Sequence, residues 1–407
     1  MKILFLTDDF PPYHKGGAGQ MAFDLAKELA IRNHQVFVLT TVQEKLKEED
    51  FTDFEGLKII RIYSKYHERW RAYRSLYNPS TIKIFKKVVQ QIKPDVIHAH
   101  NIHYHLSYYC LKLSKKYSKA VFLTFHDVMA VHYGKWLPKN CNDLKINLID
   151  KIKAAKLRYN PLRNLLIRHY LSYADKLFTV SKRLEKILNI NGIENIITIY
   201  NSIKTETWTP DNNKINKLRI DYNLIGKKVI LFGGRLSREK GIYQVFEIFK
   251  KVLLKEKNVV LLIFGGEKTA IQEFQKEAEE MNIASNIIFS GFVQREDLKF
   301  FYHCSDICLF PSLCFESFGM PCIESAAAKK PIIATCFGGP IDIIIDEETG
   351  YIINPYQTIE IADKIISLLN NQKRLKEMGM NNFQRIRDLF NFEKQVSDIL
   401  FWYNKKY

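Results

Sequence analysis

The chain has 407 residues, of which 46% are hydrophobic, and carries a net charge of +17. This length exceeds what one core usually serves, so we expect two domains of about 200 residues each, and the composition excludes a disordered or low-complexity protein. No apolar run approaches the roughly eighteen residues of a membrane-spanning helix, and the first run, at residues 3–6, is too short for a signal-peptide core. We therefore expect a cytoplasmic protein whose seven cysteines are buried free thiols.

Short apolar runs typical of strands alternate with helical patterns along the chain. The first series is 2–7, 35–41, 95–98, 120–125, 176–180 and 196–200, and the second is 228–232, 259–264, 287–289, 307–310, 332–334 and 350–353. Such alternation predicts parallel sheets covered on both faces. Because the polar segment 204–227 separates the two series, we predict an α/β protein of two Rossmann-like, doubly wound domains, with its ligand in the interdomain cleft outside the carboxyl ends of the strands.

The positive charge lies almost entirely in the first half of the chain, since residues 1–208 carry +15 and residues 209–407 carry +2. Two basic stretches rich in aromatic residues, 61–87 and 145–176, contribute to it. In the second stretch Leu162, Leu165 and Leu166 recur at helical spacing beside Arg163 and Arg168. Such a helix can lie on an anionic membrane surface, or it can face the core with a solvated basic rim. No nucleic-acid-binding motif is present, so we expect no nucleic-acid partner.

The loop after the first predicted strand carries Gly16 and Gly17 and precedes an apolar helix. Residues 17–22 formally match the dinucleotide pattern G-x-G-x-x-A. The loop is too long for the tight turn of that motif, and no acidic residue closes the second strand, so we do not expect NAD. Glycines before a helix still allow the backbone to approach a phosphate.

A second glycine-containing loop, residues 233–241, follows a predicted strand and precedes a helix. Its Arg235 and Lys240 are suitably spaced to hold a diphosphate. Two fixed cations would stabilise the negative charge that a departing nucleoside diphosphate accumulates. The alternative is a solvated surface loop.

Two carboxylates, Glu316 and Glu324, flank the start of a predicted helix. Phe318 and Gly319 should form a tight loop and Pro321 should occupy the first helical turn, which leaves backbone N–H groups facing an anion. Glu316 before the helix and Glu324 one turn inside it could reach hydroxyls on both sides of that anion, as a sugar nucleotide requires. Alternatively, one acid stabilises the helix dipole and the other is an ordinary helical glutamate.

Two groups of residues suggest a metal. Cys304, Cys308 and Cys314 could surround zinc, but Cys308 lies in an apolar run, and we interpret all three as core residues. The histidine cluster at positions 98, 100, 103 and 105 has no carboxylate nearby until Asp127, so we favour packing or lining of a ligand cleft. The chain also lacks a D-x-D triplet, so we expect no catalytic metal.

In chain order, these features resemble the retaining glycosyltransferases of family 4, the group 1 glycosyl transferases with the GT-B fold. The residues that carry the resemblance are Gly16, Gly17, His126, Ser181, Arg235, Lys240, Glu316 and Glu324. The resemblance covers nearly the whole chain, and the E-x7-E spacing of the last two residues is its most specific part. Asn201-Ser202 departs from the Asn-Gly that is frequent in the family, so Ser202 receives no role.

The resemblance implies a set of catalytic and donor-binding residues. Glu316 and the backbone at Phe318, Gly319 and Met320 would hold the donor sugar, and His126 would touch it near its reacting face. Arg235 and Lys240 would grip the diphosphate, with Gly16 and Gly17 closing over it. Glu324 would bind the ribose, and backbone around Val293 would contact the base.

The resemblance also implies domain roles and a reaction. Residues 1–208 would bind the acceptor, 209–390 would bind the nucleotide sugar, and a helix at 391–407 would cross back to the first domain. The enzyme would transfer a sugar with retention of configuration to a hydroxyl of a lipid-linked saccharide or glycolipid, for a cell-surface polysaccharide. We expect no metal cofactor, in agreement with the missing D-x-D triplet. Together with the positive charge of the first half of the chain, the resemblance indicates peripheral association with the inner face of the plasma membrane. A GT-B sugar-nucleotide epimerase and a non-catalytic subunit that binds a nucleotide sugar remain alternatives.

Overall fold

The computed structural model describes residues 1–13, 16–44 and 51–406. His14 and Lys15 of the first glycine loop lie outside the described residues. The chain forms two compact units. Unit 1 comprises Met1–Trp136, Leu144–Asn201 and Glu393–Tyr407, and unit 2 comprises Leu137–Asp143 and Ser202–Phe392.

Unit 1 contains an eight-stranded sheet in the order β3-β4-β2-β1-β5-β6-β7-β8, in which only the β3–β4 pair is antiparallel among the described strands. Its strands are β1 (Lys2–Thr7), β2 (Gln35–Val42), β3 (Phe51–Phe54), β4 (Leu57–Tyr63), β5 (Val96–His100), β6 (Ala120–Phe125), β7 (Lys176–Thr179) and β8 (Ile196–Thr198). Its helices are α1 (Gly17–Ile31), η1 (Glu68–Trp70), α2 (Arg71–Arg74), α3 (Pro79–Ile92), α4 (Tyr109–Tyr117), α5 (Leu148–Ala155), η2 (Lys156–Arg158), α6 (Arg163–Leu171), α7 (Lys182–Ile190) and α16 (Phe392–Lys406), which belongs to unit 1 from Glu393 onward.

Unit 2 contains a fully parallel six-stranded sheet in the order β11-β10-β9-β12-β13-β14. Its strands are β9 (Lys228–Gly233), β10 (Val259–Phe264), β11 (Ile287–Gly291), β12 (Ile307–Phe310), β13 (Ile332–Thr335) and β14 (Gly350–Ile353). Its helices are η3 (Thr205–Trp208), α8 (Asn212–Asp221), η4 (Arg238–Lys240), α9 (Ile242–Lys255), α10 (Lys268–Glu280), η5 (Ala284–Asn286), α11 (Arg295–Cys304), α12 (Met320–Ala327), α13 (Pro340–Ile343), α14 (Thr358–Leu369) and α15 (Gln372–Leu389).

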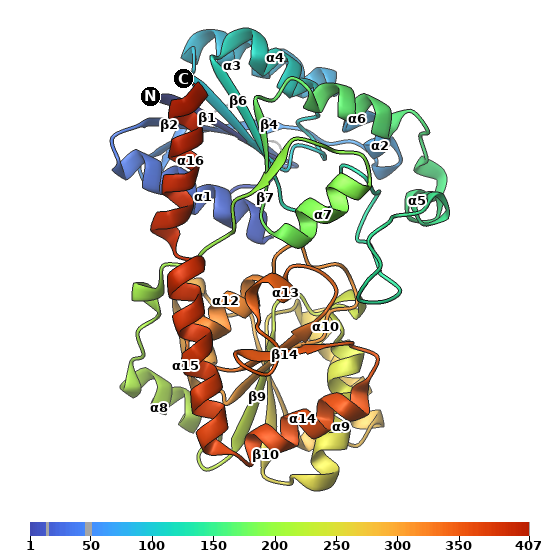
Figure 1. Ribbon diagram of the computed structural model, residues 1–407, viewed down its shortest axis with the longest axis vertical. Coiled ribbons are helices and arrows are strands. Elements are labelled where there is room, and N and C mark those ends of the chain that lie inside the picture. The colour runs from blue at the N-terminus through green and yellow to red at the C-terminus, as the bar shows by residue number, and fades with distance from the viewer. Residues whose placement is uncertain (14–15, 45–50, 407) are drawn as a thin grey trace. The chain divides into compact units, whose positions relative to one another are not determined.

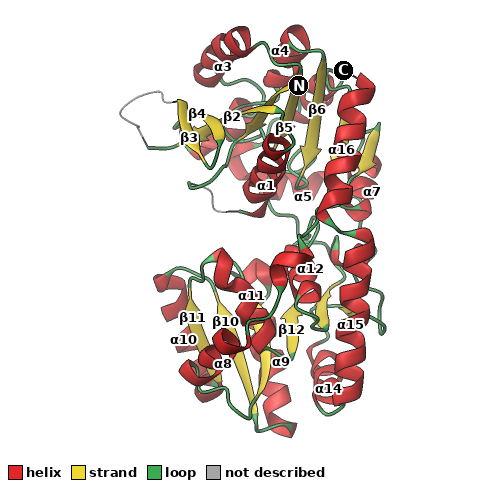
Figure 2. Cartoon of the chain, turned by 90° about the vertical axis from the view of Figure 1, so that its left-hand side faces the viewer, coloured by secondary structure: helices red, strands yellow, loops and turns green. Residues whose placement is uncertain are grey.

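Helices cover both faces of each sheet, which explains the apolar character of the strands (Figures 1 and 2). All six residues of β10 are buried, for example, and so are all six of β6. In α9 one apolar face is buried along Val245, Phe246, Phe249 and Val252. The prediction of parallel α/β sheets covered on both faces is therefore confirmed.

The polar segment 204–227, for which no secondary structure was predicted, contains η3 and α8. The hairpin of β3 and β4 was not predicted, although its turn has a sequence signal. Glu55 and Gly56 both have positive φ, 52° and 80°, and a two-residue turn of this kind matches the twist of a hairpin.

The cysteines also differ from the prediction. Cys141 and Cys336 form a disulfide within unit 2, so the expectation of free thiols is wrong for this pair. It is correct for Cys110, Cys304, Cys308, Cys314 and Cys322, which are free and buried.

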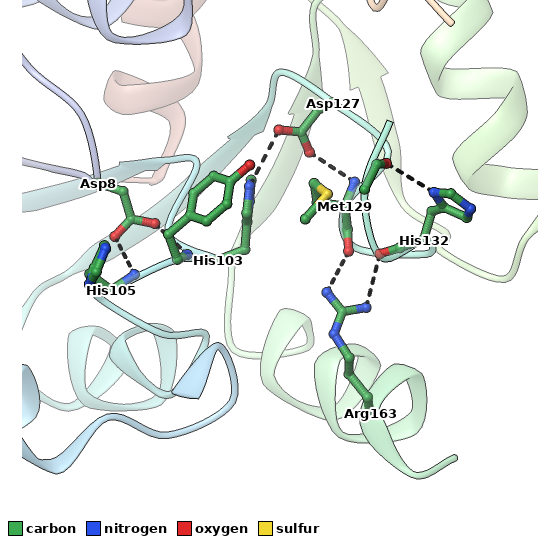
Figure 3. Close-up of polar contacts among 9 residues, drawn as sticks. Asp8, His103, His105, Asp127, Met129, His132 and Arg163 are labelled. Atoms are coloured by element: carbon green, nitrogen blue, oxygen red, sulfur yellow. Dashed lines mark hydrogen bonds and ion pairs between the residues drawn. The ribbon is translucent and has the colours of Figure 1, made fainter. Parts of the chain in front are cut away.

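Asp8, directly after β1, fixes the loop that follows β5 (Figure 3). Its carboxylate is 2% exposed and accepts backbone N–H bonds from Tyr104, His105 and Leu106 at 2.6, 2.9 and 2.8 Å. Burial raises the pKa of Asp8 to about 7, although these three hydrogen bonds oppose the increase. The folded state therefore retains a proton at Asp8 that the unfolded chain loses near pH 4.

This shift predicts a pH-dependent contribution to stability. Because the pKa of Asp8 is higher in the folded state, its contribution is present at low pH and is lost as the pH rises from about 4 to about 7. The free energy of unfolding of the wild type, minus that of Asp8→Asn, should fall by about 3 kcal/mol between pH 4.5 and pH 7.5. Urea unfolding of both proteins at both pH values measures this difference. The buried histidines are present in both proteins, so the contribution of their titration cancels. Glu44→Gln, at an exposed position, should show no such change, and a constant difference for Asp8→Asn would contradict the assignment.

Candidate functional site

The carboxyl ends of β9 and β12 and the start of α12 form a pocket in unit 2, which we call the unit 2 pocket. It encloses about 470 Å³ of empty space, part of it open to solvent. Four of the predicted site residues line it: Arg235, Lys240, Glu316 and Gly319. The other lining residues are Phe232, Gly233, Gly234, Phe310, Ser312, Pro321, Cys322 and Pro340.

An ion pair between Lys240 and Glu316 lies in this pocket. Lys240 Nζ is 2.6 Å from Glu316 Oε1, and the hydroxyl of Ser312 donates to the same oxygen. Burial disfavours the charged form of Lys240, but the nearby carboxylate of Glu316 outweighs it and raises the pKa of Lys240. Lys240 is therefore a fixed cation at neutral pH, and its charge is partly balanced by one carboxylate.

The backbone around Glu316 is fixed by close contact with the loop after β13. Glu316 N donates to Phe337 O at 2.8 Å, and Gly339 N donates to Glu316 O at 2.7 Å. Gly338 has a φ of 122°, and a Cβ at this position would lie 2.0 Å from Glu316 O. Only glycine fits there, because the two chain segments touch backbone to backbone.

The helix start after Glu316 agrees with the prediction. Gly319 is the N-cap of α12 with a φ of 103°, Met320 is the first helical residue, and Pro321 lies in the first turn. Phe318 is buried, with its ring centroid 5.9 Å from that of Phe390. The start of α12 is therefore held by packing on one side and by the glycine turn on the other.

Glu324 lies one turn inside α12 and is not among the residues that line the unit 2 pocket. Its Oε2 accepts a hydrogen bond from Tyr302 Oη at 2.7 Å. Burial raises the pKa of Glu324, and the hydrogen bond from Tyr302 opposes this increase. Tyr302 is thus a contact that sequence reasoning missed, since nothing in its spacing marks it.

The remaining donor-site predictions fall in both units. Val293 lies between β11 and α11 in unit 2, away from the lining of the unit 2 pocket. In unit 1, Gly16 is the N-cap of α1 and Gly17 is its first residue. His126 follows β6, where its Nε2 lies 2.9 Å from His100 Nδ1. Burial lowers the pKa of His126 to about 4, so its imidazole is neutral at physiological pH.

The other histidines of the first sheet are mainly held by protein contacts. His98 Nδ1 lies 2.6 Å from Tyr403 Oη of α16, and its Nε2 lies 2.8 Å from Thr124 Oγ1. Burial also lowers the pKa of His98, to about 3. Within residues 1–13, 16–44 and 51–406, no three His, Cys, Asp or Glu side chains are grouped to hold a metal. Independence of a metal remains a prediction.

In the basic stretch of α6, the burial of Arg163 differs from both expected arrangements, whereas exposed leucines agree with the membrane-surface alternative. Leu162 and Leu165 are 59% and 61% exposed, whereas Arg163 is 2% exposed. Arg163 donates to Met129 O at 2.6 Å and to His132 O at 3.2 Å (Figure 3). A charged side chain is rarely buried without such partners, so the sequence pattern favoured a surface arginine here.

Comparison with known proteins identifies the family. The Glycosyltransferase Family 4 model matches residues 15–207, and the Glycosyl transferases group 1 model matches residues 215–385. Together they cover most of the chain, which belongs to the group 1 glycosyltransferases of family 4. The fold is GT-B, as predicted.

Individual relatives and structures agree with this assignment. An uncharacterized glycosyltransferase of Methanocaldococcus jannaschii is 26% identical over 397 residues, which cover 92% of this chain and 93% of that protein. A capsular polysaccharide biosynthesis glycosyltransferase of Staphylococcus aureus is 29% identical over 242 residues, which cover 57% of this chain and 62% of that protein. The crystal structure of Anabaena HepE in complex with UDP superposes with a TM-score of 0.74 at 17% identity and covers 100% of both chains.

The contact between Gly338 and Glu316 predicts the effect of a substitution. Gly338→Ala should destabilise unit 2 by about 1–3 kcal/mol more than Gly234→Ala, because both positions have positive φ but only Gly338 has backbone within 4 Å of the added methyl group. Urea unfolding of the two variants measures the difference. Equal losses of stability would show that the backbone strain, and not the contact with Glu316, is what requires glycine.

Proposed function

We propose that this glycosyltransferase moves a sugar from a nucleoside diphosphate sugar to an acceptor hydroxyl with retention of configuration. The observation that carries the proposal is the pairing of Lys240 with Glu316 in a pocket that Arg235 also lines. Two cations suit a diphosphate, and a carboxylate beside them suits the hydroxyls of a sugar. The similarity of fold to Anabaena HepE, whose structure contains UDP, supports a nucleotide ligand.

The ion pair suggests how the donor engages the pocket. In the structure the charge of Lys240 is directed at Glu316 Oε1. A diphosphate competes for Lys240, and Glu316 is then able to accept hydrogen bonds from the donor sugar. The N-terminal end of α12, beginning at Gly319 and Met320, adds backbone N–H groups toward the same anion. Glu324, positioned by Tyr302, binds the ribose.

The reaction we propose needs no protein nucleophile. The acceptor oxygen attacks the anomeric carbon from the face that the leaving group departs from, and the bond between that carbon and the phosphate oxygen breaks. The hydroxyl proton passes to the departing phosphate, whose charge Arg235 and Lys240 stabilise. His126 contacts the donor sugar as a neutral hydrogen-bonding group, because burial lowers the pKa of its imidazole to about 4. No metal ion is required.

The acceptor we propose is a lipid-linked saccharide or glycolipid used for a cell-surface polysaccharide. The capsular polysaccharide enzyme of Staphylococcus aureus is one relative that supports this class. No helix among the described residues is long and apolar enough to span a membrane. Unit 1 instead exposes apolar side chains on α5 and α6, namely Leu148, Ile149, Leu162 and Leu165, within the basic stretch 145–176. We propose that this surface contacts the inner face of an anionic membrane.

The chemical assignment predicts loss of transfer in Glu316→Gln. The amide keeps the shape of the side chain but removes the charge that faces Lys240 and the donor sugar, so kcat should fall about a hundredfold. Release of nucleoside diphosphate from UDP-, GDP- and ADP-linked hexoses, incubated with membrane extract as acceptor, measures this rate. Glu279→Gln, an exposed glutamate of α10, is the matched control and should keep full activity.

The same assay separates the alternatives. Full transfer by Glu316→Gln would contradict the role of this residue, and conversion of the donor without acceptor would indicate an epimerase. The anomeric configuration of the product, read by NMR, tests retention. An inverted product would exclude the mechanism proposed here.

Membrane association predicts a dependence on vesicle charge. The protein should sediment with anionic vesicles at low salt and be released as salt increases, because the basic stretch is screened. Replacing Leu162 and Leu165 with serine should weaken sedimentation at least about tenfold, since each exposed leucine that is fully buried in lipid can contribute up to roughly 1.5–3 kcal/mol. Leu254→Ser, 73% exposed in unit 2, is the control. Failure of the wild type to sediment at low salt would remove the membrane assignment.

A further inference from the structure

A small pocket of unit 1 contains three arginines, and we call it the basic pocket. Its lining comprises Arg71, Ala72, His103, Met129, Tyr133, Arg158 and Arg163. These residues come from α2, from the loops after β5 and β6, from η2 and from α6, so five separate parts of the chain converge on it. The donor binding proposed above does not involve the residues that line this pocket.

Arg163 is the fully buried arginine of the basic pocket and is held by carbonyl oxygens rather than by a carboxylate. Its Nη2 donates to Met129 O at 2.6 Å, its Nη1 donates to His132 O at 3.2 Å, and its Cζ lies 4.6 Å from the ring centroid of Tyr133. Its Nε is buried and has no hydrogen-bond partner in the described part of the chain. A carbonyl fixes a guanidinium but does not neutralise it, so the pocket retains positive charge.

The side chains of the other two arginines have N–H groups that are available to a ligand. Arg71 lies with its Cζ 4.7 Å from the ring centroid of Tyr104, and within residues 51–406 its side chain makes no hydrogen bond or ion pair. Arg158 Nε donates to Ala155 O at 3.2 Å, while its Nη1 lies 3.5 Å from Glu68, whose side chain is 82% exposed. An exposed pair of this kind is weak and screened, so it leaves most of the charge of Arg158 available.

Besides the exposed Glu68, the carboxylate of Asp127 adjoins the basic pocket. Asp127 Oδ2 lies 3.4 Å from His103 Nε2, and its Oδ1 accepts the N–H of Met129 at 2.8 Å (Figure 3). Burial lowers the pKa of His103 to about 4, so this imidazole offers hydrogen bonds and no positive charge at neutral pH. Three guanidinium groups therefore outnumber Asp127, and a ligand that carries both an anionic group and hydroxyls would satisfy both signs of charge.

The three guanidinium groups indicate which kind of anion the basic pocket would bind. Their planar N–H donors match the oxygens of phosphate in bidentate geometry, and a phosphate has enough oxygens to meet donors from more than one arginine. We propose that the basic pocket binds a phosphate group of the acceptor, and this inference rests on the proposed glycosyl transfer. The acceptor class is then a phosphorylated compound, either a lipid with a phosphate headgroup or a soluble sugar phosphate.

Calorimetric titration with inorganic phosphate at low ionic strength tests the site. All proteins carry Arg235→Ala and Lys240→Ala, which remove both proposed diphosphate-binding cations from the unit 2 pocket, so that the titration reports on binding in unit 1. Arg71→Gln and Arg158→Gln should each weaken phosphate binding about ten- to a hundredfold, because each loses charge-assisted hydrogen bonds. Arg69→Gln is the matched control, since Arg69 is exposed, lies in η1 and does not line the pocket. Circular dichroism and thermal unfolding verify that each variant is folded.

The outcomes separate this inference from the proposed function. Equal binding of phosphate by all the variants would mean an adventitious ion only. No binding by any of them would mean that the pocket does not bind phosphate. Either result would overturn the site. UDP titration of the proteins with Arg235 and Lys240 intact reports independently on unit 2. If UDP binds but phosphate binding does not depend on Arg71, the inference is wrong and the proposed function still stands. Dihexanoyl phosphatidic acid and glucose 6-phosphate then distinguish the source, because the true acceptor class should bind more tightly than inorganic phosphate. If neither does, the inference is wrong.

Discussion

In the sheets of both units the strands run parallel, apart from the β3–β4 pair, so the carboxyl ends of neighbouring strands meet at one edge. This constraint brings together residues that are distant in the sequence. Lys240 after β9 and Glu316 after β12 are 76 positions apart, yet their side chains lie within 2.6 Å. In unit 1, Asp8 after β1 likewise accepts hydrogen bonds from the loop after β5. Each candidate site is thus a consequence of strand direction.

The buried charges of the molecule are held in different ways, and the difference separates structural groups from binding groups. Asp8 accepts hydrogen bonds from three backbone N–H groups, so it holds the loop after β5 in place. Lys240 and Glu316 form an ion pair in the unit 2 pocket, where we propose that the diphosphate of the donor competes with the carboxylate for Lys240. Arg163 is oriented by carbonyls and keeps its charge, which leaves the basic pocket suited to an anion.

Much of the fold and of the unit 2 pocket could be predicted from the sequence, because both depend on local patterns. Every predicted strand is observed with ends within two residues of the prediction, since buried parallel strands are continuous apolar runs. Arg235, Lys240, Glu316 and Gly319 line one pocket, because glycine turns and the proline at the start of α12 fix where those loops turn.

The features that were missed depend on contacts between distant segments. Tyr302 reaches Glu324 from another helix, and Arg163 is buried although its neighbours Leu162 and Leu165 are exposed. The disulfide of Cys141 and Cys336 joins residues 195 positions apart and has no local signal. The hairpin at Glu55 and Gly56 did have one, in its turn, but it interrupts the alternation of strands and helices on which the prediction relied.

The central claim is that the unit 2 pocket binds a nucleoside diphosphate through Arg235 and Lys240. Calorimetric titration with UDP, GDP and ADP tests it most directly. One nucleotide should bind, with affinity reduced about ten- to a hundredfold in Arg235→Ala and in Lys240→Ala, and unchanged in Lys276→Ala, whose side chain is 78% exposed. Binding of that nucleotide with equal affinity by all variants, or binding of none by the wild type, would contradict the account.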